Sequence, residues 1–240
     1  MSYSDADAAE LYDLLNRWDA SDDFYLSFVM DAGSALDVGC GTGSLLARAR
    51  DQGHPGRLAG IDPEVAMLDR ARRRVPDAEW VEGKAADIAW VGEFEVAVMA
   101  SNAFQFLVTD LEESLVKIRT ALVDGGRFVF GTRNPQVREW ESWNPSNPYD
   151  VVDHTGRELR MIYHVEQVEG DTVTFTETTA LRDNTPLRTD RATLSFLGAD
   201  SLNAVLTKTG FEVESQYGDW SRGSLTPTSE NIVTVARYRA

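Results

Sequence analysis

Residues 35–44 are the part of the sequence best suited to hold a small ligand. An apolar run carries one acid, Asp37, and then breaks into glycines at positions 39, 41 and 43. Three glycines so close together leave no β-carbons in the way, so a ligand can lie directly on the backbone. Helical spacing resumes at Ser44, and the helix start offers free N–H groups and a positive dipole end. The pattern predicts a strand, a tight glycine loop and a helix around one ligand site.

The glycine spacing distinguishes two kinds of nucleotide ligand. The dinucleotide fingerprint G-x-G-x-x-G needs its third glycine at position 44 or 46, where this chain has Ser44 and Leu46. Asp37 would also repel a pyrophosphate, whereas it would attract a cationic group. A nucleotide-dependent oxidoreductase is therefore disfavoured, and a ligand with a positive charge is favoured.

A second acid follows the next apolar run. Asp62 ends residues 57–62 about twenty residues beyond the glycine loop, the distance at which an acid reaches a ribose. Pro63 then suits the first position of a helix. Asp62 could instead only cap that helix, as Asp does in many proteins. Because Asp37 and the glycines lie nearby, the interpretation that Asp62 binds a ribose is favoured.

Residues 37–43 read D-x-G-x-G-x-G and resemble the first motif of the class I (Rossmann-like, seven-strand) S-adenosylmethionine-dependent methyltransferases. The resemblance implies S-adenosylmethionine (SAM) as the cofactor and S-adenosylhomocysteine (SAH) as its product. It places the methionyl ammonium near Asp37, the ribose hydroxyls on Asp62, the adenine amino group on Asp87, and the sulfonium beside the strand end at Ser101. Asp87 could instead be an ordinary solvated loop residue, but the adenine interpretation is favoured. The cofactor-binding residues expected on this basis are Asp37, Gly39, Cys40, Gly41, Gly43, Asp62, Pro63, Ala86, Asp87, Ile88 and Ser101.

Strand and helix patterns alternate up to residue 132. Apolar runs at 78–81, 94–100 and 127–132 read as further strands, a helical face spans 111–122, and Asp124-Gly125-Gly126 reads as a stop. Such alternation favours an α/β fold: a Rossmann-like, mostly parallel seven-stranded sheet with helices on both faces. Ligands of such sheets bind outside the carboxyl ends of the strands, where the predicted site residues would converge.

Two segments would add to this single methyltransferase domain of residues 1–240. Residues 1–30 contain two predicted helices, 5–18 and 22–30, and similar small-molecule methyltransferases use such helices as a lid, with an early Tyr near the methyl group. Tyr12 matches that Tyr loosely. Residues 138–197 read as an inserted antiparallel β subdomain with strands at 157–168, 172–181 and 187–197. It would cover the substrate cleft or form a homodimer contact.

The residues that could assist catalysis are few. Tyr12, His154 and His164 are candidates, but a single histidine in a strand or loop is more often structural, so no catalytic base is assigned. The three histidines lack metal-site spacing, and no metal is expected. The chain also lacks an Asn-Pro-Pro-Tyr-type motif after residue 100. Within the family that it resembles, this absence favours a small-molecule substrate over a macromolecule.

The composition of the chain limits its expected binding partners and compartment. The 240 residues carry a formal charge of −16, which opposes binding to nucleic acid or anionic lipid, and the arginines at 70, 72, 73 and 74 read as a solvated helix face. The single cysteine, Cys40, cannot form an intramolecular disulfide, which favours a reducing cytoplasm. Residues 1–5 lack the features of a signal peptide, and no apolar stretch is long enough to span a membrane.

These observations predict an enzyme that transfers a methyl group from SAM to a nucleophilic N or O atom of a small-molecule acceptor. A non-catalytic SAM- or SAH-binding regulatory or scaffold protein would carry the same motifs, and remains the alternative.

Overall fold

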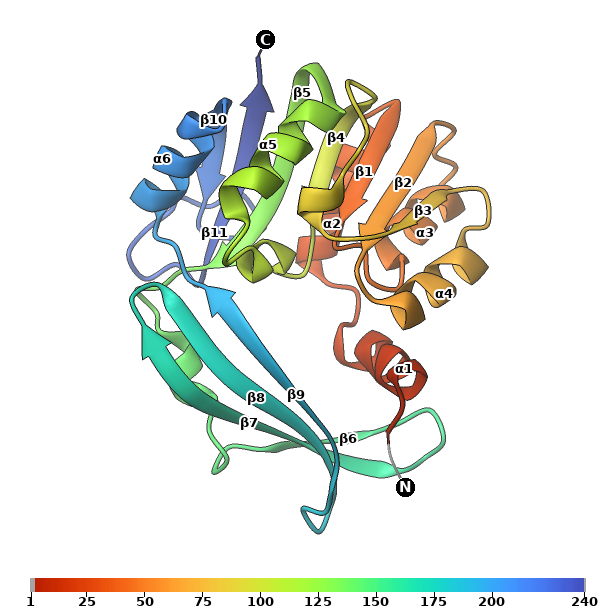
Figure 1. The fold of residues 1–240 in the computed structure, drawn as a ribbon, viewed down its shortest axis with the longest axis vertical. Coiled ribbons are helices and arrows are strands. Elements are labelled where there is room, and N and C mark those ends of the chain that lie inside the picture. The colour runs from red at the N-terminus through yellow and green to blue at the C-terminus, as the bar shows by residue number, and fades with distance from the viewer. Residues whose placement is uncertain (1–2, 240) are drawn as a thin grey trace.

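A seven-stranded sheet forms the centre of the computed structural model, which describes residues 3–239 (Figure 1). Within those residues its strand order is β10-β11-β5-β4-β1-β2-β3. β1 to β5 pair in parallel, while β11 is antiparallel to both β5 and β10. The strands are β1 (Ser34–Val38), β2 (Arg57–Asp62), β3 (Glu79–Glu82), β4 (Phe94–Met99), β5 (Leu122–Arg133), β10 (Phe211–Tyr217) and β11 (Asn231–Tyr238). The predicted Rossmann-like architecture is confirmed.

Helices cover both faces of this sheet. One face packs against α2 and α3, with α4 beside α3, and the other packs against α5 and α6. The helices are α1 (Asp5–Leu15), α2 (Ala20–Met30), α3 (Ser44–Asp51), α4 (Val65–Arg74), α5 (Leu111–Ala121) and α6 (Ala199–Lys208). Three short 3-10 turns complete them: η1 (Ala85–Asp87), η2 (Ala103–Phe106) and η3 (Glu139–Ser142). None of the helices within residues 3–239 is both long and apolar enough to cross a membrane.

The alternation of side chains along β1 decides which face receives the first acid. Leu36 and Val38 join the core under α5 and α6, whereas Ala35 joins the core under α2 and α3. Successive side chains of a strand point to opposite faces. Asp37 therefore points to the face of α2 and α3, although its apolar neighbours are buried on both sides.

The inserted subdomain is a separate antiparallel sheet with the order β6-β7-β8-β9, between β5 and α6. Its strands are β6 (Tyr149–Val152), β7 (Glu158–Glu169), β8 (Thr172–Leu181) and β9 (Pro186–Ser195). Three of these strands were predicted from the sequence, and β6 is an addition. Because β5 ends at the carboxyl edge of the large sheet, the insert stands at that edge (Figure 1).

Two apolar clusters stabilise the insert: one lies within it, and the other joins it to α1. At one end Trp140 packs edge-on against Phe196, with ring centroids 4.5 Å apart, and Trp143 packs on the same cluster. At the other end Leu11 of α1 packs with Leu159 and Met161 of β7. α1 therefore joins the insert to the rest of the molecule.

Some element boundaries differ from the sequence expectation. The first helix ends at Leu15 instead of residue 18, because Asp19 caps the next helix through a capping box with Asp22. The expected stop at residues 124–126 lies inside β5, where the pairing with β4 shifts register. The expectation of no signal peptide rests partly on Met1 and Ser2, which lie outside the described residues, as does Ala240.

Candidate functional site

The glycine loop joins β1 to α3 and has the backbone that the sequence predicted. Gly39, Gly41 and Gly43 have φ angles of 73°, 51° and 73°, a region that other residues rarely adopt. A β-carbon on Gly43 would lie 2.7 Å from Trp80 and 2.8 Å from Ala71, so this glycine permits close packing of α3 on α4. A β-carbon on Gly41 would meet nothing nearer than the Tyr12 ring, at 3.7 Å. Gly41 is therefore the glycine that exposes backbone to a ligand.

Asp37 is buried beside this loop without a partner. The residue is only 2% exposed, and its Oδ1 accepts no hydrogen bond within residues 3–239. Burial, with the negative charges of Asp62 and Asp22, raises the pKa of Asp37 to about 7. Because the charges that act on Asp37 are all negative, a cation placed here would relieve the repulsion.

Asp62 stands at the end of the neighbouring strand and is oriented by the backbone. Its Oδ2 accepts the Gly41 N–H at 2.8 Å and its Oδ1 accepts the Glu64 N–H at 2.9 Å. Burial raises the pKa of Asp62 as well, while these two hydrogen bonds oppose the shift. Each carboxylate oxygen keeps a lone pair for a further donor, such as a ribose hydroxyl.

These features fit SAM. The orphaned oxygen of Asp37 and the nearby carboxylates suit a ligand with an ammonium and a sulfonium, and Asp62 suits vicinal hydroxyls. When bound, SAM supplies a methyl group on positively charged sulfur. Asp37, Asp62 and the open backbone at Gly41 are the groups of this chain that would hold it.

The remaining predicted cofactor residues lie along the same edge, in the loops after β1, β2, β3 and β4. Asp87 is exposed in η1, where its Oδ2 accepts the Lys84 N–H at 2.8 Å. Ile88 is buried in the core, so only its backbone could meet an adenine ring. Pro63 is exposed directly after β2, and Ala86 is half-buried beside Asp87. Cys40 is buried in the glycine loop, and burial raises the pKa of its thiol, which suits a packing role.

Tyr12 reaches this site from α1. Burial and the negative charges of Asp37 and Asp62 raise the pKa of Tyr12, and they outweigh the Ser101 hydroxyl, after β4, which lowers it. The phenol therefore keeps its proton near neutral pH and acts as a hydrogen-bond group. Ser101 and Asn102 both have positive φ, 50° and 58°, a conformation that costs about 1–3 kcal/mol and is common at functional sites.

The two histidine candidates lie elsewhere. His154, in the β6–β7 turn, pairs through Nδ1 with Glu10 of α1 at 2.8 Å. His164 is exposed on β7, opposite Thr176 of β8. Neither lines the cavities at the strand ends, so the structure brings only Tyr12 among the catalytic candidates to the site. Residues 3–239 also contain no cluster of side chains able to hold a metal ion.

α1 is held against the glycine loop by a network that the sequence did not predict. Asp13 accepts the Thr42 hydroxyl at 2.5 Å and pairs with Arg70 at 2.9 Å and Arg74 at 2.5 Å. Two of the four arginines expected on a solvated face thus tie α4 to α1. The sequence does not show this role of Arg70 and Arg74, because Asp13 lies 57 and 61 residues before them.

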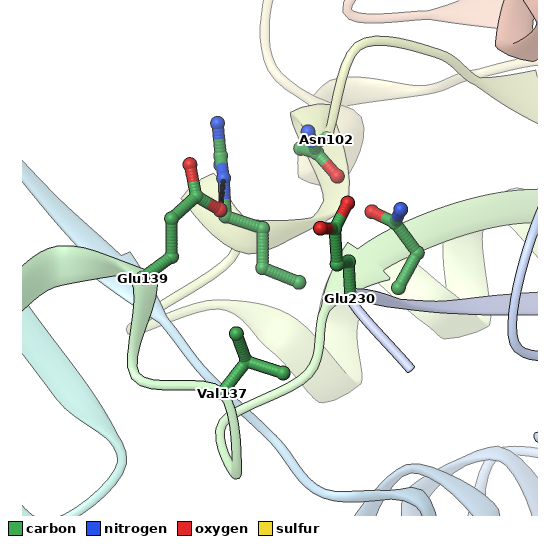
Figure 2. Close-up of a pocket in the computed structure, with 6 residues that line it drawn as sticks. Asn102, Val137, Glu139 and Glu230 are labelled. Carbon is green, nitrogen blue, oxygen red and sulfur yellow. Dashed lines mark ion pairs between the residues drawn. The ribbon is translucent and has the colours of Figure 1, made fainter. Parts of the chain in front are cut away.

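Two cavities meet at the ends of β4 and β5. The larger, of about 710 Å³, lies between α1, the start of α2 and α3, and its lining includes Tyr12, Asp22 and Ser101. The smaller, of about 410 Å³, is shown in Figure 2. Its lining residues are Asn102, Arg133, Val137, Glu139, Glu230 and Asn231. Asn102 and Arg133 line both cavities, so the smaller one opens beside the cofactor site.

Arg133 is fixed at this junction by three neighbours. Its Nε pairs with Glu139 at 2.8 Å, its Nη1 donates to Gln105 Oε1 at 3.1 Å, and its guanidinium lies 5.5 Å from the centroid of the Trp143 ring. Gln105 is fully buried and donates to the Ser195 carbonyl of β9 at 3.0 Å. This network connects β5 to the insert, and nothing in the local sequence pattern signalled it.

Comparison with known proteins agrees with this geometry. A family model described as "Methyltransferase domain" matches residues 35–126. The dTDP-3-amino-3,4,6-trideoxy-alpha-D-glucopyranose N,N-dimethyltransferase of Streptomyces venezuelae is 30% identical over 177 residues, 67% of this chain and 70% of that protein. The dTDP-4-amino-2,3,4,6-tetradeoxy-D-glucose N,N-dimethyltransferase of Saccharopolyspora spinosa is 27% identical over 87% of this chain and 86% of that protein.

Other matches are shorter or structural. The matched stretch spans 34% of a 37.1 kDa Streptomyces fradiae protein and 38% of the trans-aconitate 2-methyltransferase of Rhizobium meliloti. The crystal structure of a SAM-dependent methyltransferase from Clostridium acetobutylicum superposes with a TM-score of 0.78 at 15% identity, covering 97% of this chain and 98% of that one.

The fold and the site define a Rossmann-like methyltransferase with an inserted sheet. The chain belongs to the class I SAM-dependent methyltransferases, and SAM is its cofactor.

Proposed function

We propose that the protein methylates an amine nitrogen of a small-molecule acceptor that binds in the cavity between Asn102, Arg133 and Glu230. One observation carries the choice of nitrogen over oxygen: carboxylates and a protonated phenol border the site, and none of the histidines within residues 3–239 lines it. A hydroxyl benefits from a base in the transition state, whereas a neutral amine attacks through its own lone pair.

The chemistry asks for position more than for acid–base assistance. The nitrogen lone pair forms the bond to the methyl carbon, the carbon–sulfur electron pair stays on sulfur, and the nitrogen loses a proton to water. Carboxylates on the acceptor side suit this transfer, because positive charge moves from sulfur to nitrogen as the bond forms. The two relatives that match most of this chain are named as N,N-dimethyltransferases, which supports an amine acceptor.

The segments around the site have matching roles in this proposal. Residues 1–30 act as the lid, since α1 carries Tyr12 toward Gly41 and its apolar face packs on β7. The insert within residues 138–197 covers the acceptor cavity. Trp140 and Trp143 pack inside the insert, which supports a cover more than a homodimer contact.

The test is turnover with radiolabelled SAM across matched amine and alcohol acceptors. We expect transfer to amines, located by mass spectrometry on nitrogen, and none to the alcohols of the same shape. Transfer to alcohols alone would contradict the choice of nitrogen. SAH binding without turnover on any acceptor would contradict the enzymatic proposal and favour a binding protein.

A further inference from the structure

The smaller cavity at the end of β5 contains polar side chains that have no partner in the protein. The carboxylate of Glu230 and the amide of Asn231 make no hydrogen bond or ion pair within residues 3–239, and neither does the Asn102 amide oxygen, although that atom is buried. Figure 2 shows the Glu230 carboxylate and the Asn102 amide directed into the same space. Of these three residues, Glu230 is exposed and Asn231 is half-buried, so only the Asn102 oxygen is a buried atom without a partner. Because buried polar atoms are normally paired, that oxygen, with two unpartnered polar side chains beside it, indicates a polar ligand.

The topology explains why these residues meet. β11 is antiparallel to β5, and Asn231 stands opposite Arg133 in the register. The start of β11 therefore lies at the same edge as the ends of β4 and β5. Glu230 and Asn231 reach the cavity although they lie about a hundred residues after β5.

The charge of the cavity follows from one ion pair. Arg133 is the cation of the lining, and it is neutralised by Glu139 at 2.8 Å. Glu230 then leaves one negative charge unbalanced. A carboxylate without a partner in a hollow favours a cation there, and the formal charge of −16 adds a field of the same sign.

We infer that the acceptor binds with a protonated amino group held by Glu230, with hydroxyls or other polar groups on Asn102 and Asn231, and that it carries no phosphate group. Because an ammonium has no lone pair, this nitrogen gives a proton to water before it attacks the methyl group. This inference rests on the proposed function and deepens it. It also separates this chain from the two relatives named for dTDP-linked sugars, because a diphosphate would meet the unbalanced carboxylate.

The test measures binding to the protein saturated with SAH, by calorimetry, with three matched probes: glucosamine, glucose and glucosamine 6-phosphate. We expect glucosamine to bind about tenfold more tightly than either of the others, the size of one charge-assisted contact. Glu230→Gln should remove this preference. Glu113→Gln, which removes an exposed charge on α5 away from the cavity, should keep it.

A second variant acts in the opposite direction. Asn231→Asp adds a carboxylate to the same cavity and should strengthen the preference for glucosamine. Equal or tighter binding of the phosphorylated sugar, no binding of glucosamine, or an unchanged preference in Glu230→Gln would each overturn the inference. If SAH itself fails to bind, the proposed function fails; if SAH binds and the preference is missing, only the acceptor inference fails.

Discussion

The ring of Tyr12 lies 3.7 Å from the point that a β-carbon on Gly41 would occupy. This contact joins the lid helix to the glycine loop at the position where backbone is open to the cofactor. Gly43, two residues later, faces Trp80 and Ala71 instead. One motif therefore contains a glycine for the ligand and a glycine for the packing of the protein itself.

Alanine at these two glycines should separate the two roles. Gly43→Ala forces a β-carbon to within 2.7 Å of Trp80, so it should lower the free energy of unfolding by more than the roughly 1–2 kcal/mol expected for positive φ alone. Gly41→Ala should cost only that backbone strain but weaken SAH binding. Thermal unfolding measures the stability of the two variants, and calorimetry measures their binding of SAH. Equal losses of stability in both variants would contradict the assignment.

Asp37 predicts an unusual dependence of stability on pH in the free protein. Its folded pKa of about 7 lies above the ordinary value of 3.8, so the folded state binds the proton more tightly than the unfolded state. The contribution of this group to stability is present at low pH and is lost as pH rises from about 4 to about 7. Thermal melts of the wild type and Asp37→Asn across this range should diverge toward neutral pH, with the variant the more stable.

The same variant should bind the cofactor less well. Because a carboxylate attracts the methionyl ammonium and a neutral amide does not, Asp37→Asn should weaken SAH binding by about ten- to a hundredfold near neutral pH. Asp77→Asn, which removes an exposed partner of Arg50, is the control and should leave the Kd unchanged. A variant that is both less stable and normal in binding would show that Asp37 only supports the fold.

Tyr12→Phe tests whether the phenol acts as a base. Since burial raises the pKa of Tyr12, its proton stays in place and the hydroxyl can only orient groups near Ser101. We expect kcat/KM to fall by no more than about tenfold, the loss of one hydrogen bond, with the shape of the pH profile unchanged. Loss of a basic limb from the profile in Tyr12→Phe would identify the phenol as a proton acceptor.

Asp13→Ala should release the lid. The side chain bridges Thr42, Arg70 and Arg74. Its removal leaves α1 attached through the pairs of Glu10 with Arg70 and His154 and through its apolar contacts with the insert. We expect faster hydrogen exchange in residues 5–15 and weaker SAH binding, with little change in the exchange of β4 and β5. Unchanged exchange in α1 would show that the Glu10 ion pairs and the apolar contacts hold the helix without Asp13.

The cofactor half of the site could be predicted from the sequence because its signals are local. Asp37 and the glycines lie within seven residues, and Asp62 ends the next strand, so parallel topology brings them to one edge. The acceptor half could not. Glu230 joins Asn102 only through the antiparallel register of β11, and Gln105 joins Ser195 only through the position of the insert. Neither pairing leaves a periodic or motif signal.

Glu139→Gln should change which acceptors the enzyme tolerates. In the wild type Glu139 neutralises Arg133, and Glu230 sets the net charge of the cavity. The substitution frees the guanidinium, which Gln105 and Trp143 still hold in place, so the cavity becomes neutral overall and gains a partner for anions. Phosphorylated amines should then bind the SAH complex about tenfold more tightly than they bind the wild type, while unphosphorylated amines should change little. Glu141→Gln, whose partner Arg138 lies outside the cavity lining, is the matched control. An equal gain in both variants would mean that the effect comes from the overall charge of the protein and that Arg133 does not face the acceptor.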